Sequence, residues 1–154
     1  MDSATIAAIS TPPGTAGVAV IRVSGPHAGL VSRTLIGRIP MPRHASLATI
    51  VDPAGGGDLD RGIVLWFPAP ASFTGEDVLE LHVHGGRAVV AAVLRGVLAV
   101  EGVRPAEAGE FTRRAFENGR MDLSEVEGLA DLLQAETEAQ RRQAFSLYSG
   151  RLTS

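Results

Sequence analysis

The 154-residue sequence contains no cysteine and no lysine. Without cysteine it has no disulfide framework, no thiolate metal ligand and no cysteine nucleophile, and it suits a reducing compartment. All 14 basic residues are arginine. The absence of lysine excludes a phosphate-binding loop that ends in Gly-Lys-Ser/Thr, a Schiff-base lysine and a lysine general base.

Long hydrophobic runs and a strong charge of one sign are also lacking. No apolar run approaches the roughly 18 residues that a membrane span needs, and residues 1–4 do not begin a signal peptide. The net charge is −3, so no overall positive field attracts nucleic acid. We therefore expect a cytoplasmic protein without a membrane segment, whose contact with RNA needs a local patch or another domain.

The remaining composition, with 45% hydrophobic and 20% charged residues, is typical of a globular domain. Runs rich in β-branched residues predict strands, and apolar residues at helical spacing predict helices. The expected strands are 4–9, 18–23, 46–51, 62–67 and 78–83, and the expected helices are 26–35, 89–98 and 107–117. In the last of these helices we expect Phe111, Ala115 and Phe116 to share one apolar side.

A further helix is expected from Asp122, where Glu125 completes a pair similar to a capping box. Its apolar stripe continues beyond Gln140, close to the end of the sequence. A stripe of this length needs a partner surface. We therefore interpret the sequence as a fragment of a longer protein.

Segment 78–84 carries candidate functional residues. Because side chains alternate across a strand, its apolar odd-numbered positions share one face, which we expect in the core. Glu80, His82 and His84 share the other face, next to a glycine pair at 85–86 that lets a ligand or another backbone approach closely. This polar face is either the outer side of a half-exposed strand or a ligand site.

Arg22 is a second candidate, because it lies in an apolar strand on the same face as Val18 and Val20. An arginine there either reaches water at the strand end or is partly buried and needs a partner. Glu80 and an anionic ligand are both suitable partners.

Two other kinds of site are weighed at the histidines. His82 and His84 lie roughly 6–7 Å apart along a strand, which is compatible with one zinc-like ion, and Glu80 could add an oxygen ligand. The sequence offers no well-placed third histidine, so the metal signal is weak. His-Gly-Gly at 84–86 is similar to the oxyanion loops of esterases, but no Gly-x-Ser-x-Gly elbow accompanies it.

Several longer motifs follow one another along the chain. The most specific are Ser-Phe-Thr-Gly-Glu-Asp at 72–77 and Gly-Glu-Phe-Thr-Arg-Arg-Ala-Phe at 109–116. The others are Thr-Ile-Ala-Ala at 5–8, Thr-Pro-Pro-Gly at 11–14, Ile-Arg-Val-Ser-Gly at 21–25, Leu-Trp-Phe-Pro at 65–68, His-Gly-Gly at 84–86 and Asn-Gly-Arg-Met-Asp-Leu at 118–123. Together, and in this order, they resemble the N-terminal domain of the MnmE (TrmE) family of tRNA-modification GTPases over nearly the whole chain.

The resemblance implies an α+β fold, a mixed β-sheet packed with helices, similar to the tetrahydrofolate-binding domain of glycine-cleavage T-type proteins. It implies a folate-binding and dimerisation domain at 1–119 and the beginning of a helical domain at 120–154. Two copies are expected to form a homodimer, with the folate near their interface.

The resemblance also implies the site residues. The family's folate contacts match Arg22, Glu80 and Arg120, and the expected ligand is 5-formyl- or methylene-tetrahydrofolate. Neither a catalytic residue nor a metal ligand is implied within this fragment. The side-chain chemistry agrees, because the pterin edge presents two adjacent N–H donors that a carboxylate such as Glu80 accepts bidentately. How the two arginines divide the ring carbonyls and the glutamyl tail stays open.

For the full-length family, the resemblance implies a GTPase that modifies C5 of the wobble uridine of certain tRNAs together with a flavin-dependent partner of the MnmG (GidA) type. The folate supplies the one-carbon unit. GTP hydrolysis, with potassium and magnesium, belongs to a domain that this sequence lacks. We therefore expect this chain alone to hydrolyse no GTP.

Two other functions compete with folate binding. In the first alternative, the chain is a pure interaction module with a vestigial pocket. In the second, it is an independent aminomethyltransferase of the T type. The intact set of Arg22, Glu80 and Arg120 argues against the first. The short chain argues against the second, because T-type enzymes are longer and need a lipoyl-carrier partner.

Overall fold

A computed structural model of the protein describes residues 4–10 and 17–121. The helix expected from Asp122, the domain expected at 120–154 and the turn expected at 11–14 lie wholly or almost wholly outside these residues. The elements in chain order are β1 (Thr5–Ile9), β2 (Val18–Ser24), α1 (Ala28–Ile36), β3 (Ser46–Val51), β4 (Asp58–Phe67), β5 (Val78–His84), α2 (Arg87–Leu98), β6 (Val103–Pro105) and α3 (Glu110–Glu117).

The strands form one mixed sheet in the order β3-β4-β5-β2-β1-β6. Neighbouring strands are antiparallel, except that β1 and β6 are parallel. β5 therefore lies between β4 and β2, which brings the two strands that carry Glu80 and Arg22 side by side near the middle of the sheet. The mixed sheet with packed helices confirms the expected α+β class.

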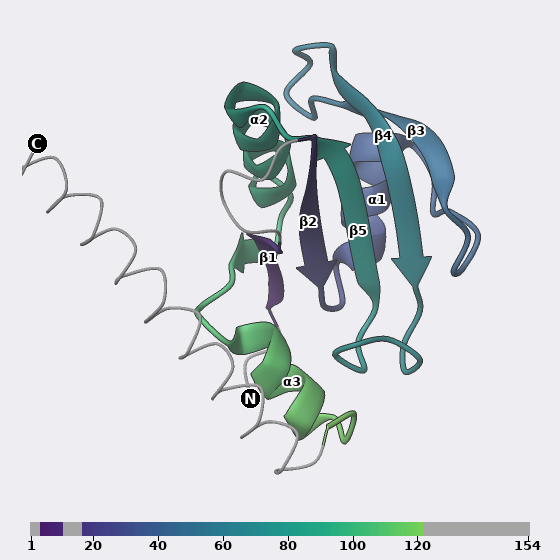
Figure 1. The fold of residues 1–154 in the computed structure, drawn as a ribbon, viewed down its shortest axis with the longest axis vertical. Coiled ribbons are helices and arrows are strands. Elements are labelled where there is room, and N and C mark those ends of the chain that lie inside the picture. The colour runs from purple at the N-terminus through teal and green to yellow at the C-terminus, as the bar shows by residue number, and fades with distance from the viewer. Residues whose placement is uncertain (1–3, 11–16, 122–154) are drawn as a thin grey trace, which may run out of the picture.

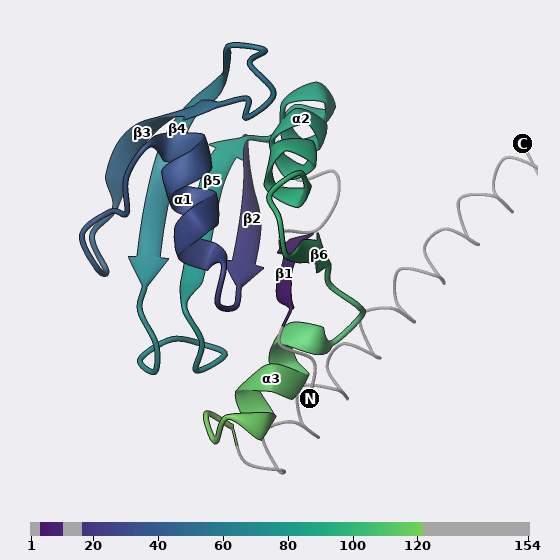
Figure 2. The same ribbon diagram turned by 180° about the vertical axis from the view of Figure 1, so that it is seen from behind.

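Helices α1 and α2 cover one face of the sheet, as Figure 2 shows, while the strands lie in front of them in Figure 1. The core lies between these layers, and its fully buried side chains include Ile21, Val23, Leu35, Leu79, Leu81 and Val93. Burial of each such side chain contributes about 1.5–3 kcal/mol relative to exposure. We call the opposite side of the sheet, which neither α1 nor α2 covers, the helix-free face.

The faces of β5 confirm the sequence expectation. Leu79, Leu81 and Val83 are buried in the core, whereas Glu80 and His82 are partly exposed and His84 is exposed. The same alternation places Arg22 on the helix-free face of β2, between inward-facing Ile21 and Val23.

Helix α3 lies beside the end of the sheet at which β2 ends and β5 begins (Figures 1 and 2). Three of the expected strands differ from their observed bounds by one residue, and two strands differ more clearly. β4 begins at Asp58 instead of Gly62, and the three-residue β6 was not expected because a segment ending in Pro105 has no strand periodicity. Its pairing with β1 is a tertiary contact. Among the described residues, no helix is long and apolar enough to cross a bilayer.

Candidate functional site

An ion pair between Arg22 and Glu80 lies at the centre of the helix-free face. The two residues are directly opposite each other in the β2–β5 register. Nε and Nη2 of Arg22 donate to Oε2 of Glu80 at 3.3 and 3.2 Å. The side chains are only 26% and 17% exposed, so water screens this pair less than it screens a surface salt bridge. Of the alternatives open for Arg22, the structure selects pairing with Glu80.

His82 adds a second contact to the same carboxylate. Its Nε2 lies 3.0 Å from Oε1 of Glu80, on the same face of β5. Each oxygen of Glu80 thus has one protein neighbour. A carboxylate oxygen has two lone-pair sites, so Oε2 is filled by its two hydrogen bonds from Arg22 and Oε1 retains acceptor capacity.

Two aromatic rings lie against Arg22. The guanidinium carbon is 5.3 Å from the ring centroid of Phe73 and 5.8 Å from that of Phe111. Both distances fall within the range of a cation–π interaction. Phe73 belongs to the loop before β5 and Phe111 to the first turn of α3, so the polar pair is walled by two segments far apart in sequence.

The loop at 72–77 is hydrogen bonded to the residues that follow the end of α3. Asn118 Nδ2 donates to the carbonyl of Thr74 at 2.9 Å, and Arg120 Nε donates to the carbonyl of Ser72 at 3.0 Å. Gly75, at φ +82°, leaves the space that these side chains need, because a Cβ there would lie 2.8 Å from the Cβ of Asn118. The loop and helix therefore form one wall beside Arg22.

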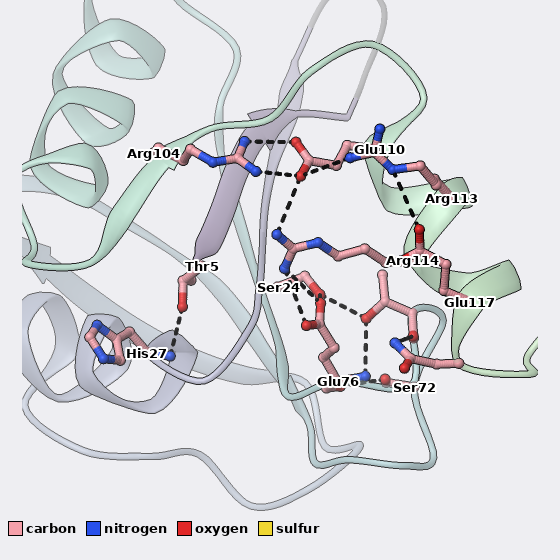
Figure 3. A network of polar contacts seen from close by, with 12 residues as sticks. Thr5, Ser24, His27, Ser72, Glu76, Arg104, Glu110, Arg113, Arg114 and Glu117 are labelled. Atoms are coloured by element: carbon pink, nitrogen blue, oxygen red, sulfur yellow. Dashed lines mark hydrogen bonds and ion pairs between the residues drawn. The ribbon is translucent and has the colours of Figure 1, made fainter. Parts of the chain in front are cut away.

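A buried charge network reinforces this wall (Figure 3). Arg104 donates from Nη1 and Nη2 to the two oxygens of Glu110 at 2.8 and 2.6 Å. Arg114 lies 3.3 Å from the same carboxylate and 3.1 Å from Glu76, which accepts a further hydrogen bond from Ser24. Burying these charges is tolerable because each has a hydrogen-bonded partner of opposite sign.

Glu110 has the most strongly altered acidity in this network. Its side chain is fully buried, and the hydrogen bonds from Arg104 lower its pKa from 4.5 to about 2, against the opposing effect of burial. The backbone N–H of Glu107 and the charge of Arg114 act in the same direction as Arg104. Glu110 is therefore a structural anion in the functional pH range.

The network corrects the expected orientation of α3. The buried residues of this helix are Glu110, Arg114 and Ala115, whereas Phe116 is 43% exposed. Hydrophobic periodicity placed Phe116 with Ala115, but the salt-bridge partners supplied by Arg104 and Glu76 allow charged side chains to face inward instead.

The segments that form this site match a known protein family. Residues 5–120 match the family model described as GTP-binding protein TrmE N-terminus. The chain belongs to the TrmE N-terminal family. The match includes β1 to α3 and all the site residues described above.

Curated relatives of this TrmE N-terminal chain are similar over almost all of it. The tRNA modification GTPase MnmE of Parvibaculum lavamentivorans is 60% identical over 149 residues, which are 96% of this chain and 34% of that relative. The mitochondrial 5-taurinomethyluridine-[tRNA] synthase subunit GTPB3 of Homo sapiens is 60% identical over 151 residues, which are 97% of this chain and 31% of that relative. The MnmE of Novosphingobium aromaticivorans is 58% identical over 97% of this chain. The chain thus spans about a third of the length of these relatives.

The TrmE resemblance assigned folate contacts to three residues. Two of them contact each other in the structure, and the third lies nearby. Arg22 and Glu80 form the central ion pair. Arg120 does not hydrogen bond to either of them within the described residues. It reaches the same region through the carbonyl of Ser72, the residue before Phe73.

A second carboxylate–imidazole pair lies at the far end of β5. Asp60 accepts the backbone N–H of His84 at 2.9 Å and approaches Nδ1 of the same residue at 2.8 Å. Burial raises the pKa of Asp60, but the hydrogen bonds from His84 outweigh burial and leave this pKa below its usual value. The pairing fixes the ring of His84, whose side chain is 73% exposed.

A shallow hollow of about 490 Å³ lies beside this pair on the helix-free face. Its aliphatic lining comes from Val18, Leu47, Ile63, Leu65 and Val83, and its basic lining from Arg61, His82 and His84. The hollow therefore adjoins the Arg22–Glu80 pair through His82.

The metal and esterase interpretations gain no support from this geometry. His82 is directed to Glu80 and His84 to Asp60, and no group of three or more metal-ligating side chains gathers among the described residues. The backbone N–H of Gly85 donates to the carbonyl of Gly17, so it is not available for an oxyanion.

Sequence reasoning missed Phe73, Phe111, Asp60 and the buried network as parts of the site. Phe73 and Phe111 lie within the two most specific motifs, and that position was the available signal for them. No local pattern marks Asp60, because its partner His84 lies 24 residues away. The spacing of Glu110 and Arg114 is that of an i, i+4 helical ion pair, but spacing alone does not reveal burial.

Proposed function

We propose that this chain binds a reduced folate, 5-formyl- or methylene-tetrahydrofolate, on its helix-free face. The observation that carries the proposal is the half-buried Arg22–Glu80 pair, walled by the rings of Phe73 and Phe111. This arrangement combines an oriented acceptor, a fixed cation and two aromatic surfaces within one small region. A heteroaromatic ligand with polar edges can use all three.

The donor set fits the pterin edge. Oε1 of Glu80 has a free lone pair, and the carboxylate can accept the adjacent ring N–H and exocyclic amine as a fork when the ligand replaces one of the two Arg22 hydrogen bonds on Oε2. Arg22 holds that carboxylate in place from the neighbouring strand. Arg120, fastened to Ser72, supplies positive charge at the end of β5 nearer the loop, where it can meet a ring carbonyl. Folate, when bound, supplies a one-carbon unit.

The proposal extends to the longer protein of which such a chain forms the N-terminal part. The names of the relatives describe tRNA modification GTPases, and we infer the same process for this chain. In that protein the folate site serves modification of C5 of the wobble uridine in the cytoplasm, together with an MnmG-type flavoprotein. GTP hydrolysis with potassium and magnesium belongs to a part that is absent from this sequence.

The proposal includes a relationship of this fold to the folate domain of glycine-cleavage T-type proteins. It also includes the formation of a homodimer by two copies of the chain. Apolar side chains outside the hollow, such as Ile9, Leu30 and Met41, are 41–64% exposed, so the described residues offer apolar surface that a second copy could cover. Sedimentation velocity over a range of concentrations tests this directly. We expect a dimer, and a strictly monomeric chain would contradict it.

Calorimetric titration with 5-formyltetrahydrofolate tests folate binding. Glu80→Gln removes the charge and replaces one acceptor by a donor, and we expect affinity to fall at least tenfold because hydrogen bonds to a charged group are lost. Glu101→Gln, at an exposed position, is the matched control and should bind as the wild type does. Thermal unfolding of each variant confirms that the fold is retained.

The same titration separates the competing functions. A folded wild-type chain that forms dimers but takes up no folate is a pure interaction module, and the folate proposal then fails. If a folded Glu80→Gln variant bound folate with wild-type affinity, the folate site would not lie at Glu80 on β5.

A further inference from the structure

The hollow on the helix-free face combines apolar walls with basic groups. Arg61, His82 and His84 line it together with aliphatic residues from four strands, and none of the described residues that line it is acidic. A surface of this kind favours a ligand with an apolar or aromatic body and an anionic end, because the body is desolvated while the charge meets a cation.

Arg61 is the cation best placed to meet such a charge. It is exposed, and its guanidinium makes no ion pair or hydrogen bond with the rest of the described chain. The adjacent carboxylate, Asp60, is only 11% exposed and is directed to the backbone and the ring of His84. Asp60 therefore orients His84 instead of pairing with Arg61.

The hollow is continuous with the proposed folate site. His82 contacts Glu80 at 3.0 Å on one side and lines the hollow on the other. Glu80, His82 and His84 share one face of β5, so the distance from Glu80 to His84 along the strand is about 13 Å. The pteridine and the aminobenzoyl group together span at least this distance, so a folate whose pteridine edge lies at Glu80 brings its glutamate to the His84 end of the hollow.

We propose that the hollow holds the glutamyl tail of the folate, and that Arg61 makes the site selective for folates with poly-γ-glutamate tails. The inference rests on the proposed folate function and adds the direction in which the ligand lies. The pteridine is at Glu80, the aminobenzoyl group crosses the aliphatic walls, and the carboxylates meet Arg61. Arg120 lies towards the opposite end of β5, where it contacts the pteridine and not the tail.

The test compares the monoglutamate and triglutamate forms of 5-formyltetrahydrofolate by calorimetric titration of the 154-residue chain at low salt. We expect the triglutamate to bind about three- to fivefold more tightly, the size of one partly exposed ion pair. The ratio should fall to about one in Arg61→Gln and should decrease with added salt. The matched control is Arg33→Gln, because Arg33 is exposed on α1, which covers the other face of the sheet.

A second pair of variants changes the wall without removing Arg61. Leu47 is 53% exposed, so its replacement should leave the fold intact. Leu47→Glu places a negative charge in the hollow and should weaken the triglutamate more than the monoglutamate. Leu47→Gln has a similar shape without the charge and should affect both forms equally.

Four results would overturn the inference, and they are distinguishable. Equal affinity of the wild type for both tail lengths overturns it and leaves the folate function standing. Loss of the ratio in Arg120→Gln instead of Arg61→Gln reverses the direction of the ligand. A shifted monomer–dimer equilibrium in Arg61→Gln, with an unchanged ratio, assigns the hollow to a second copy. Failure of the folded wild type to bind either form refutes the folate function itself.

Discussion

Arg114 joins helix α3 to the loop in front of β5, because its Nη1 lies 3.1 Å from Oε1 of Glu76. The same guanidinium contacts Glu110 one helical turn earlier, and its side chain is only 5% exposed. The loop carries Phe73 and the helix carries Phe111, so this single arginine connects the two walls of the candidate folate site.

Replacement of Arg114 should therefore destabilise the fold strongly. In Arg114→Met two carboxylates lose a buried partner, and we expect the free energy of unfolding in urea to fall by about 3–5 kcal/mol. Arg113→Met is the matched control, because the neighbouring Arg113 side chain is 54% exposed and its ion pairs contribute about 1 kcal/mol or less. Equal losses in the two variants would contradict the structural role of the buried network.

Stability in acid should depend on Glu110. Its folded pKa of about 2 lies below the ordinary 4.5, so its contribution is complete above pH 4.5 and is lost as the pH falls through about 2. The depression corresponds to about 3 kcal/mol for this fully buried carboxylate. Urea unfolding at several pH values between 2 and 6 should therefore show a smaller decline in Glu110→Gln than in the wild type. If the free energy of unfolding of Glu110→Gln fell with pH as steeply as that of the wild type, another group would be responsible for the acid sensitivity.

Gly75 should tolerate alanine poorly. Both Gly75 and Gly57 have φ near +85°, and each alanine variant incurs about 1–2 kcal/mol for a left-handed conformation. Only at Gly75 would the new Cβ also press against Asn118 and Arg120, since nothing lies within 4 Å of the corresponding point at Gly57. Chemical denaturation should therefore give a lower free energy of unfolding for Gly75→Ala than for Gly57→Ala. The reverse order would contradict the close contact between the loop and α3.

The ring of His84 should carry its proton on Nδ1 when neutral, because Nδ1 faces the carboxylate of Asp60. Long-range proton–nitrogen NMR distinguishes this tautomer directly. Asp60→Ala should restore the mixture of tautomers that an unpartnered imidazole shows, while the spectrum of exposed His44 stays unchanged. Persistence of a single Nδ1–H tautomer in the variant would show that Asp60 does not orient the ring.

Several features of this protein follow from the sequence alone. Strand alternation is local, so it correctly placed Glu80 and Arg22 on polar positions of apolar strands. The motifs at 72–77 and 109–116 indicated the family that the comparisons show. Both kinds of inference need only neighbouring residues or residue order.

The tertiary structure alone decided which of these residues meet. Arg22 contacts Glu80 because β5 inserts between β4 and β2, a pairing between strands that are more than 50 residues apart. The inward side of α3 was decided in the same way. Glu110 and Arg114 are buried because Arg104 and Glu76 approach from other segments, and the resulting ion pairs offset a desolvation cost that the helix alone could not meet. Periodicity measures the hydrophobicity of one segment, whereas burial of a charge depends on partners that only the folded chain brings together.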